Sequence, residues 1–95
     1  MIVPEGGDEG ISDQVNFIGI WIKAIFGKVL NELRVERSLT QEKLAELADF
    51  DRTYIYRLEK GKREPSLSTI LKLSDALKVS PGEFLDRVNK LRKEL

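Results

Sequence analysis

The sequence predicts a single all-α domain. A chain of 95 residues is too short to build a second hydrophobic core. Residues that favour helices, chiefly Leu, Glu, Lys, Arg and Ala, are common, and there are only three prolines. Apolar residues recur at spacings of three and four, which is the periodicity of an amphipathic helix. We therefore expect a fold of five helices.

Residues 1–22 are expected to form a partly flexible arm, and residues 23–95 the folded domain. Residues 1–12 hold a proline and three glycines and show no apolar periodicity. An apolar stripe, for which Asp13 is a candidate cap, then predicts a helix from about residue 23 to 37. Within it Gly19 and Gly27 each weaken the helix by roughly 1 kcal/mol relative to Ala. For the β-branched and aromatic run Phe17–Ile22, helix and strand both stay open. The stripe consists of Ile18, Trp21, Ile22, Ile25, Phe26, Val29, Leu30 and Leu33.

The next two helices are short and close together. Thr40 is expected to cap a helix over residues 41–48. Asp51 is expected to cap a second helix over residues 52–60, which Gly61 ends. Only a few residues separate the two helices, so they form a helix-turn-helix pair.

Two further helices complete the domain. Ser66 is expected to cap the first of them. Ser80-Pro81-Gly82-Glu83 has the pattern of a capping box with proline at the first helical position. The apolar residues that these last four helices offer to the core are Leu44, Ala45, Leu47, Ala48, Ile55, Leu58, Leu67, Ile70, Leu71, Leu73, Ala76, Leu77, Phe84, Leu85, Val88, Leu91 and Leu95.

The composition excludes several functional classes. The chain has neither Cys nor His, which removes disulfides, thiol nucleophiles, the usual zinc ligands and the commonest general base. It also lacks a glycine-rich loop that would cradle a nucleotide. We therefore expect a protein that is not an enzyme, with no metal and no cofactor. No apolar run is long enough to span a membrane and no secretory signal is visible, so we expect a cytoplasmic protein.

The charge is unevenly distributed although the formal net charge is zero. Residues 1–22 carry four acidic residues and no basic one, whereas residues 23–95 carry all sixteen Lys and Arg and twelve acids. Between Arg52 and Arg63 there are five basic residues and one acid. Binding to phosphates requires such a local basic patch and not a basic average.

The second helix of the pair is expected to read DNA. In a helix-turn-helix the second helix lies in the major groove while the first crosses the backbone. If Ile55 and Leu58 face inward, the outward face carries Arg52, Thr53, Tyr56 and Arg57. An arginine can donate two hydrogen bonds to guanine O6 and N7, and a threonine can hydrogen-bond or pack on a thymine methyl. We therefore predict that Arg52, Thr53 and Arg57 read bases.

Residues 26–86 resemble the phage-repressor/Cro type of helix-turn-helix, the xenobiotic-response-element family. The resemblance rests on Leu39-Thr40-Gln41-Glu42-Lys43-Leu44-Ala45, on Tyr54 to Ser66, and on Leu67 to Leu85. It implies a lambda-repressor-like fold of five helices, here with an amino-terminal extension. Asp51-Arg52-Thr53-Tyr54-Ile55 is also similar to controller proteins of restriction–modification systems. Residues 1–22 have no counterpart in the minimal family domain.

The resemblance implies further roles by position. Gln41 matches a phosphate-binding position, and Lys60, Lys62 and Arg63 match the loop that contacts the DNA backbone. Arg34 and Glu59 match a pair that forms a structural ion pair. Glu42 and Glu46 match an acidic patch with which some activators of the family touch RNA polymerase. Tyr54 and Tyr56 are also candidates for the backbone, with a base contact left open for Tyr56.

We predict a homodimeric transcription regulator, a repressor or a controller protein, that reads a palindromic operator on double-stranded DNA. The candidate dimer interface comprises Trp21, Val88, Leu91 and Leu95, although the same residues also suit an added core layer. An alternative of a different class is an antitoxin or protein-interaction module that binds a partner through the apolar segment near the amino terminus.

Overall fold

The computed structural model describes the backbone of residues 8–94 and the side chains of residues 21–94. This part of the chain forms five helices and no strand, as the sequence predicts. The helices are α1 (Asp8–Glu36), α2 (Gln41–Ala48), α3 (Arg52–Glu59), α4 (Leu67–Leu77) and α5 (Pro81–Glu94). The predicted all-α fold is confirmed, and α2 and α3 match the two short helices expected for the helix-turn-helix pair.

The long helix α1 differs most from the prediction. It begins at Asp8, not near residue 23, so residues 8–12, expected in the arm, are helical, and Phe17–Ile22 is helix rather than strand. Once a helix is nucleated each added residue costs little, and no proline interrupts residues 8–36. The predicted division after residue 22 falls inside α1, so the secondary structure marks no boundary there. Residues 1–7 lie outside the described part.

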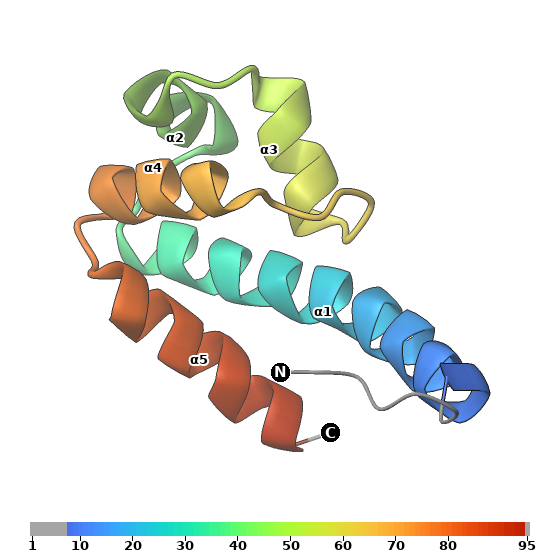
Figure 1. Ribbon diagram of the computed structural model, residues 1–95. Coiled ribbons are helices and arrows are strands. Elements are labelled where there is room, and N and C mark those ends of the chain that lie inside the picture. The colour runs from blue at the N-terminus through green and yellow to red at the C-terminus, as the bar shows by residue number, and fades with distance from the viewer. Residues whose placement is uncertain (1–7, 95) are drawn as a thin grey trace.

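Helix α1 is the scaffold on which the other helices pack. In Figure 1, α2, α3 and α4 lie on one side of it and α5 lies on the other. α1 contacts both α3 and α5, and α2 contacts α3 and α4. One core joins all five helices; its fully buried members include Leu30, Leu33, Leu44, Ile55, Leu58, Leu73, Leu77 and Phe84.

The predicted starts of α2 to α5 are confirmed by their capping bonds, whereas Asp13, the cap expected for the first helix, lies inside α1. The hydroxyl of Thr40 accepts a hydrogen bond from the Lys43 amide, and a carboxylate oxygen of Asp51 accepts one from the Thr53 amide. The hydroxyls of Ser66 and Ser80 accept equivalent bonds from amides in the first turns of α4 and α5. These side chains satisfy amides that have no partner within the helix.

Four leucines predicted as core candidates are instead exposed on the surface. Each lies on a helix whose buried face is already filled by neighbours; in α2, for example, Leu44, Ala45 and Ala48 are buried while Leu47 is half exposed. The four exposed leucines are Leu47, Leu67, Leu71 and Leu85. In the part of the chain that the structure describes, no helix has an apolar stretch long enough to cross a membrane.

Candidate nucleic-acid interface

Helix α3 is docked on α1 by direct contact between their backbones. A Cβ atom placed on Gly27 would lie 2.4 Å from the carbonyl oxygen of Leu58 and 2.7 Å from that of Glu59. At the end of α3, Gly61 has a φ of +71° and lies against Ala24. Only glycine leaves room for this approach, so Gly27 fixes how closely α1 holds the carboxyl end of α3.

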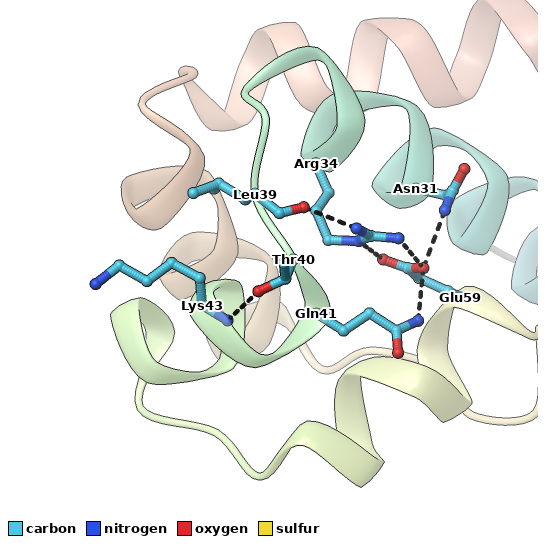
Figure 2. Close-up of polar contacts among 7 residues, drawn as sticks. All are labelled: Asn31, Arg34, Leu39, Thr40, Gln41, Lys43 and Glu59. Carbon is cyan, nitrogen blue, oxygen red and sulfur yellow. Dashed lines mark hydrogen bonds and ion pairs between the residues drawn. The ribbon is translucent and has the colours of Figure 1, made fainter.

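A buried carboxylate then joins three helices (Figure 2). Glu59 of α3 accepts hydrogen bonds from Arg34 Nε at 2.6 Å, from Asn31 Nδ2 at 3.1 Å and from Gln41 Nε2 at 3.0 Å. The guanidinium of Arg34 also donates to Glu59 Oε1 and to the backbone oxygen of Leu39. The predicted ion pair between Arg34 and Glu59 is present and joins α1 to α3. The hydrogen bond from Gln41 adds α2 to the same network.

The environment of Glu59 keeps its carboxyl group charged. Burial raises the pKa of Glu59, but the hydrogen bonds from Arg34, Gln41 and Asn31 and the charge of Arg34 outweigh burial. The net result is a pKa below its ordinary value. The side chain of Glu59 is only 5% exposed, so the carboxylate serves the scaffold and is not available to DNA.

The outward face of α3 carries the predicted base readers. Arg52, Thr53 and Arg57 are exposed, whereas Ile55 and Leu58 are completely buried. Within residues 21–94 the side chains of Arg52, Thr53 and Arg57 form neither hydrogen bonds nor ion pairs with other residues. Their donors are therefore free to meet an external acceptor such as a base edge.

One edge of α3 faces α4 and the loop before it. The hydroxyl of Tyr54 lies 3.0 Å from Thr69 Oγ1, and the guanidinium of Arg63 lies over the Tyr54 ring. Lys62 and Arg63 are exposed. Tyr54, predicted to direct its hydroxyl at a phosphate, directs it at α4 in this structure, so its position leaves Lys62 and Arg63 as the more open donors on this edge.

The other edge of α3 borders an open depression of about 570 Å³, which we call the α1–α3 groove. Tyr56 and Lys60 lie on its α3 side, with the Lys60 ammonium 5.6 Å from the centre of the Tyr56 ring. Gln41, the predicted phosphate ligand, borders the groove and spends one donor on Glu59. The groove is lined by Ala24, Lys28, Asn31, Arg34, Gln41, Arg52, Tyr56, Glu59 and Lys60.

Two groove residues were missed by the sequence-based prediction. Lys28 and Asn31 lie outside the helix-turn-helix pair, in α1, and Asn31 belongs to the Glu59 network. The available signal was their spacing, since residues 24, 28 and 31 share one helical stripe that also leads to Arg34. Reading that stripe required knowing that α3 lies beside it.

The remaining predicted sites lie away from α3. Glu42 and Glu46 are exposed on α2, and Glu46 pairs with Lys43 at 2.8 Å. Among the candidate dimer residues, Trp21 is 40% exposed. Val88, for which a dimer interface and a core layer were both open, is buried in the core of its own chain, because its side of α5 faces α1. Leu91 is half-buried against the same core, and Leu95 lies outside the described residues.

Comparison with known proteins places the chain in a family. Residues 30–84 match the family model described as helix-turn-helix. The chain is 44% identical over 66 residues to the control protein C.BamHI of Bacillus amyloliquefaciens, an alignment that covers 68% of this chain and 82% of that protein.

Two solved structures are also similar. The restriction–modification controller protein C.AhdI of Aeromonas hydrophila has a TM-score of 0.64 and 45% identity, with 65% of this chain and 94% of that chain covered. The controller protein C.Esp1396I, solved as a tetramer in complex with its natural 35-base-pair operator, has a TM-score of 0.68 and 29% identity over 73% of this chain and 91% of that one.

These similarities favour a regulator over the protein-interaction module left open by the sequence. The matched proteins are controllers and regulators, not enzymes. The matched segment also contains α2 and α3 in full. The chain therefore belongs to the xenobiotic-response-element type of the helix-turn-helix family, a family of DNA-binding transcription regulators.

Proposed function

We propose that this chain is the controller protein of a restriction–modification system and acts as a dimer on a palindromic operator. The observation that carries the proposal is its 44% identity to the control protein C.BamHI across 82% of that protein's length. The free donors on the outward face of α3 support it, because a reading helix needs side chains that the fold itself does not use.

In the proposed mechanism each subunit inserts α3 into one major groove. Arg52, Thr53 and Arg57 contact base edges, and Lys62 and Arg63 contact phosphates on one side of the helix. Gln41, Tyr56 and Lys60 contribute further contacts to the backbone. A twofold dimer then places its two reading helices in half-sites about one helical turn, roughly 34 Å, apart.

The proposed dimer surface lies on the middle of α1 and the carboxyl end of α5. Trp21 is exposed on α1, and Leu91 keeps part of its surface open on α5. In Figure 1 the carboxyl end of α5 lies on the side of α1 away from α3, so an interface there leaves the reading face free. A symmetric contact of this kind makes two copies of α3 available to one duplex.

Activation through RNA polymerase is a further part of the proposal. Glu42 is exposed at the start of α2. Glu46 is also exposed but shares its charge with Lys43. Glu42 is therefore the stronger candidate for contact with polymerase. A regulator of promoters works where the DNA lies, so we propose a cytoplasmic location.

Selection from random duplex DNA tests the proposal. The intact chain should enrich duplexes with two inverted half-sites whose centres are about 10 base pairs apart. Sedimentation of the complex should give two chains per enriched site, or four if two sites are filled side by side. The double variant Arg52→Ala/Arg57→Ala should enrich no shared sequence, whereas the matched control Lys72→Gln/Lys78→Gln, on α4 and its carboxyl cap, should enrich the original one. Enrichment of single, non-repeated sites would contradict the dimer, and no enrichment by the intact chain would contradict the function.

A further inference from the structure

The α1–α3 groove contains cations that the fold itself does not use. Lys28, Arg52 and Lys60 line it, and within residues 21–94 none of the three forms an ion pair. The fourth cation of the groove, Arg34, is neutralised by Glu59 at 2.6 Å. The groove therefore carries an excess of about three positive charges on an open surface.

We propose that Lys28 of α1 binds a phosphate of the DNA backbone in the α1–α3 groove, so that the DNA-binding surface extends beyond the helix-turn-helix pair. This inference rests on the proposed function, because it assumes that α3 enters a major groove. It adds a contact from the scaffold helix that sequence reasoning did not assign.

The position of Lys28 follows from the glycine contact. Gly27 brings the backbone of α1 against the carbonyl groups of Leu58 and Glu59. Lys28 is the next residue and is exposed, so its side chain leaves α1 beside the outer edge of α3. Its long, flexible stem lets the ammonium group reach outward to a point charge such as a phosphate.

The chemistry of the groove suits a phosphodiester. Carboxylates attract cations, but the one carboxylate lining the groove, Glu59, already receives four hydrogen bonds from Arg34, Asn31 and Gln41. The groups left to meet a ligand are ammonium and guanidinium donors, together with the hydroxyl of Tyr56. Such donors are the usual partners of phosphate oxygens.

The placement also suits a duplex. A major groove is bordered by two phosphate strands, and α3 has basic residues along both of its edges. Lys62 and Arg63 lie on the edge that faces α4, where Arg63 covers the Tyr54 ring. Lys28 and Lys60 lie on the edge that faces α1. Each edge can then contact one strand, which fixes the position of α3 between them.

The test is the salt dependence of binding to duplex DNA by the full-length chain and the variant Lys28→Ala. Each phosphate contact that is lost should make the slope of log affinity against log salt shallower by about 0.9. The corresponding loss of affinity at 0.1 M salt is about eightfold relative to 1 M, and it should be the same for an operator and for a random duplex. Lys28→Arg should restore the slope. Lys78→Gln, at the exposed carboxyl cap of α4, is the matched control.

The outcomes separate this inference from the proposed function. A shallower slope for Lys28→Ala alone, with unchanged thermal unfolding, supports the phosphate contact. An unchanged slope, or an equal change for Lys78→Gln, overturns it even if the chain still prefers its operator. If the chain binds duplexes without sequence preference, the proposed function fails, yet the slope on random duplex still decides the role of Lys28. If it binds no duplex at all, both fail.

Discussion

Helix α1 holds its two neighbours by opposite means. It meets α3 backbone to backbone at Gly27, beside the buried pair of Arg34 and Glu59, whose side chains are 14% and 5% exposed. It meets α5 through large side chains: the rings of Phe26 and Phe84 stack with their centres 5.0 Å apart. The ion pair on that side, between Arg87 and Glu36, is 34% and 46% exposed.

The α5 contact mainly stabilises the fold, whereas the α3 contact mainly fixes the position of a helix. Burial of apolar side chains stabilises a fold in proportion to the area removed from water and is tolerant of small shifts. A glycine contact with a directed hydrogen-bond network gives less energy but sets the geometry narrowly. Helix α3, whose side chains must meet base edges, is held by the glycine contact and the hydrogen-bond network. Helix α5 is held by apolar packing, which tolerates small shifts.

The largest expected effect is on the α5 side. Phe84→Ala should lower the free energy of unfolding by about 3–5 kcal/mol, because it empties a completely buried ring position. Urea titration measures this, and Leu85→Ala, at an exposed neighbour, is the control with a small effect. If the two contacts are separable, the fraction of Phe84→Ala chains that remains folded should bind the operator with nearly normal affinity. A loss of binding larger than the loss of folded protein would show that the α5 contact also positions α3.

The second effect is on the α3 side. Gly27→Ala should lower the free energy of unfolding by about 1–3 kcal/mol, because the added Cβ collides with backbone carbonyl groups that cannot rotate away. Helix propensity alone predicts the opposite sign, a gain of about 1 kcal/mol. The folded variant should also lose operator affinity, since α3 is displaced. Gly82→Ala is the control and should keep both stability and affinity, because its Cβ would meet only the hydroxyl oxygen of Ser80, at an ordinary contact distance of 4.0 Å. A stabilised Gly27→Ala would show that α1 and α3 are not in close contact.

The third effect is a pH-dependent one. Glu59→Gln should cost roughly 1–3 kcal/mol at pH 7, because Arg34 then keeps a buried charge without its partner. The folded-state pKa of Glu59 is below its ordinary value of 4.5, so the stabilisation is present above that value and is lost as the pH falls through the folded-state pKa. The gap between the two unfolding curves should therefore close in acid. A gap that is constant from pH 7 to pH 3 would contradict a folded-state pKa of Glu59 below its ordinary value.

The smallest effect is expected for the exposed pair. The hydrogen bond from Arg87 lowers the pKa of Glu36, but water and salt screen the pair on the surface. Glu36→Gln should leave the urea midpoint close to that of the unchanged chain. Its operator affinity should also be indistinguishable from that of the unchanged chain. An effect as large as that of Glu59→Gln would remove the distinction between the two sides of α1.

Much of the fold could be predicted because its signals are local. The caps at Thr40, Asp51, Ser66 and Ser80 act within one helical turn, and each is confirmed. The start of α1 was missed because a glycine- and acid-rich segment has weak local preference, while helix propagation extends from the strong segment after it. The exposure of Leu47 and Leu67 depends on which helices cover them, which no local pattern encodes.

The candidate site divides in the same way. The ion pair of Arg34 with Glu59 was predicted by the resemblance and confirmed. The base-reading roles of Arg52, Thr53 and Arg57 stay predictions, although their exposure on α3 is consistent with them. The choice between interface and core stayed open for Val88, which is buried in the core, and Lys28 was overlooked, because both depend on which helix lies beside them. The role of Gly27 in the close contact between α1 and α3 could not be predicted for the same reason, because the sequence shows only that a glycine destabilises a helix.

In the proposed complex α3 reads bases, while Lys62 and Arg63 after it bind phosphates. The most direct measurement compares the binding profiles of Arg57→Ala and Lys62→Ala over a library of single-base variants of the selected operator. Arg57→Ala should cost roughly 1–3 kcal/mol on the operator and lose its preference at one base pair in each half-site. Lys62→Ala should weaken every sequence equally and make the salt slope shallower by about one unit. Equal losses on every sequence for both variants would contradict the account.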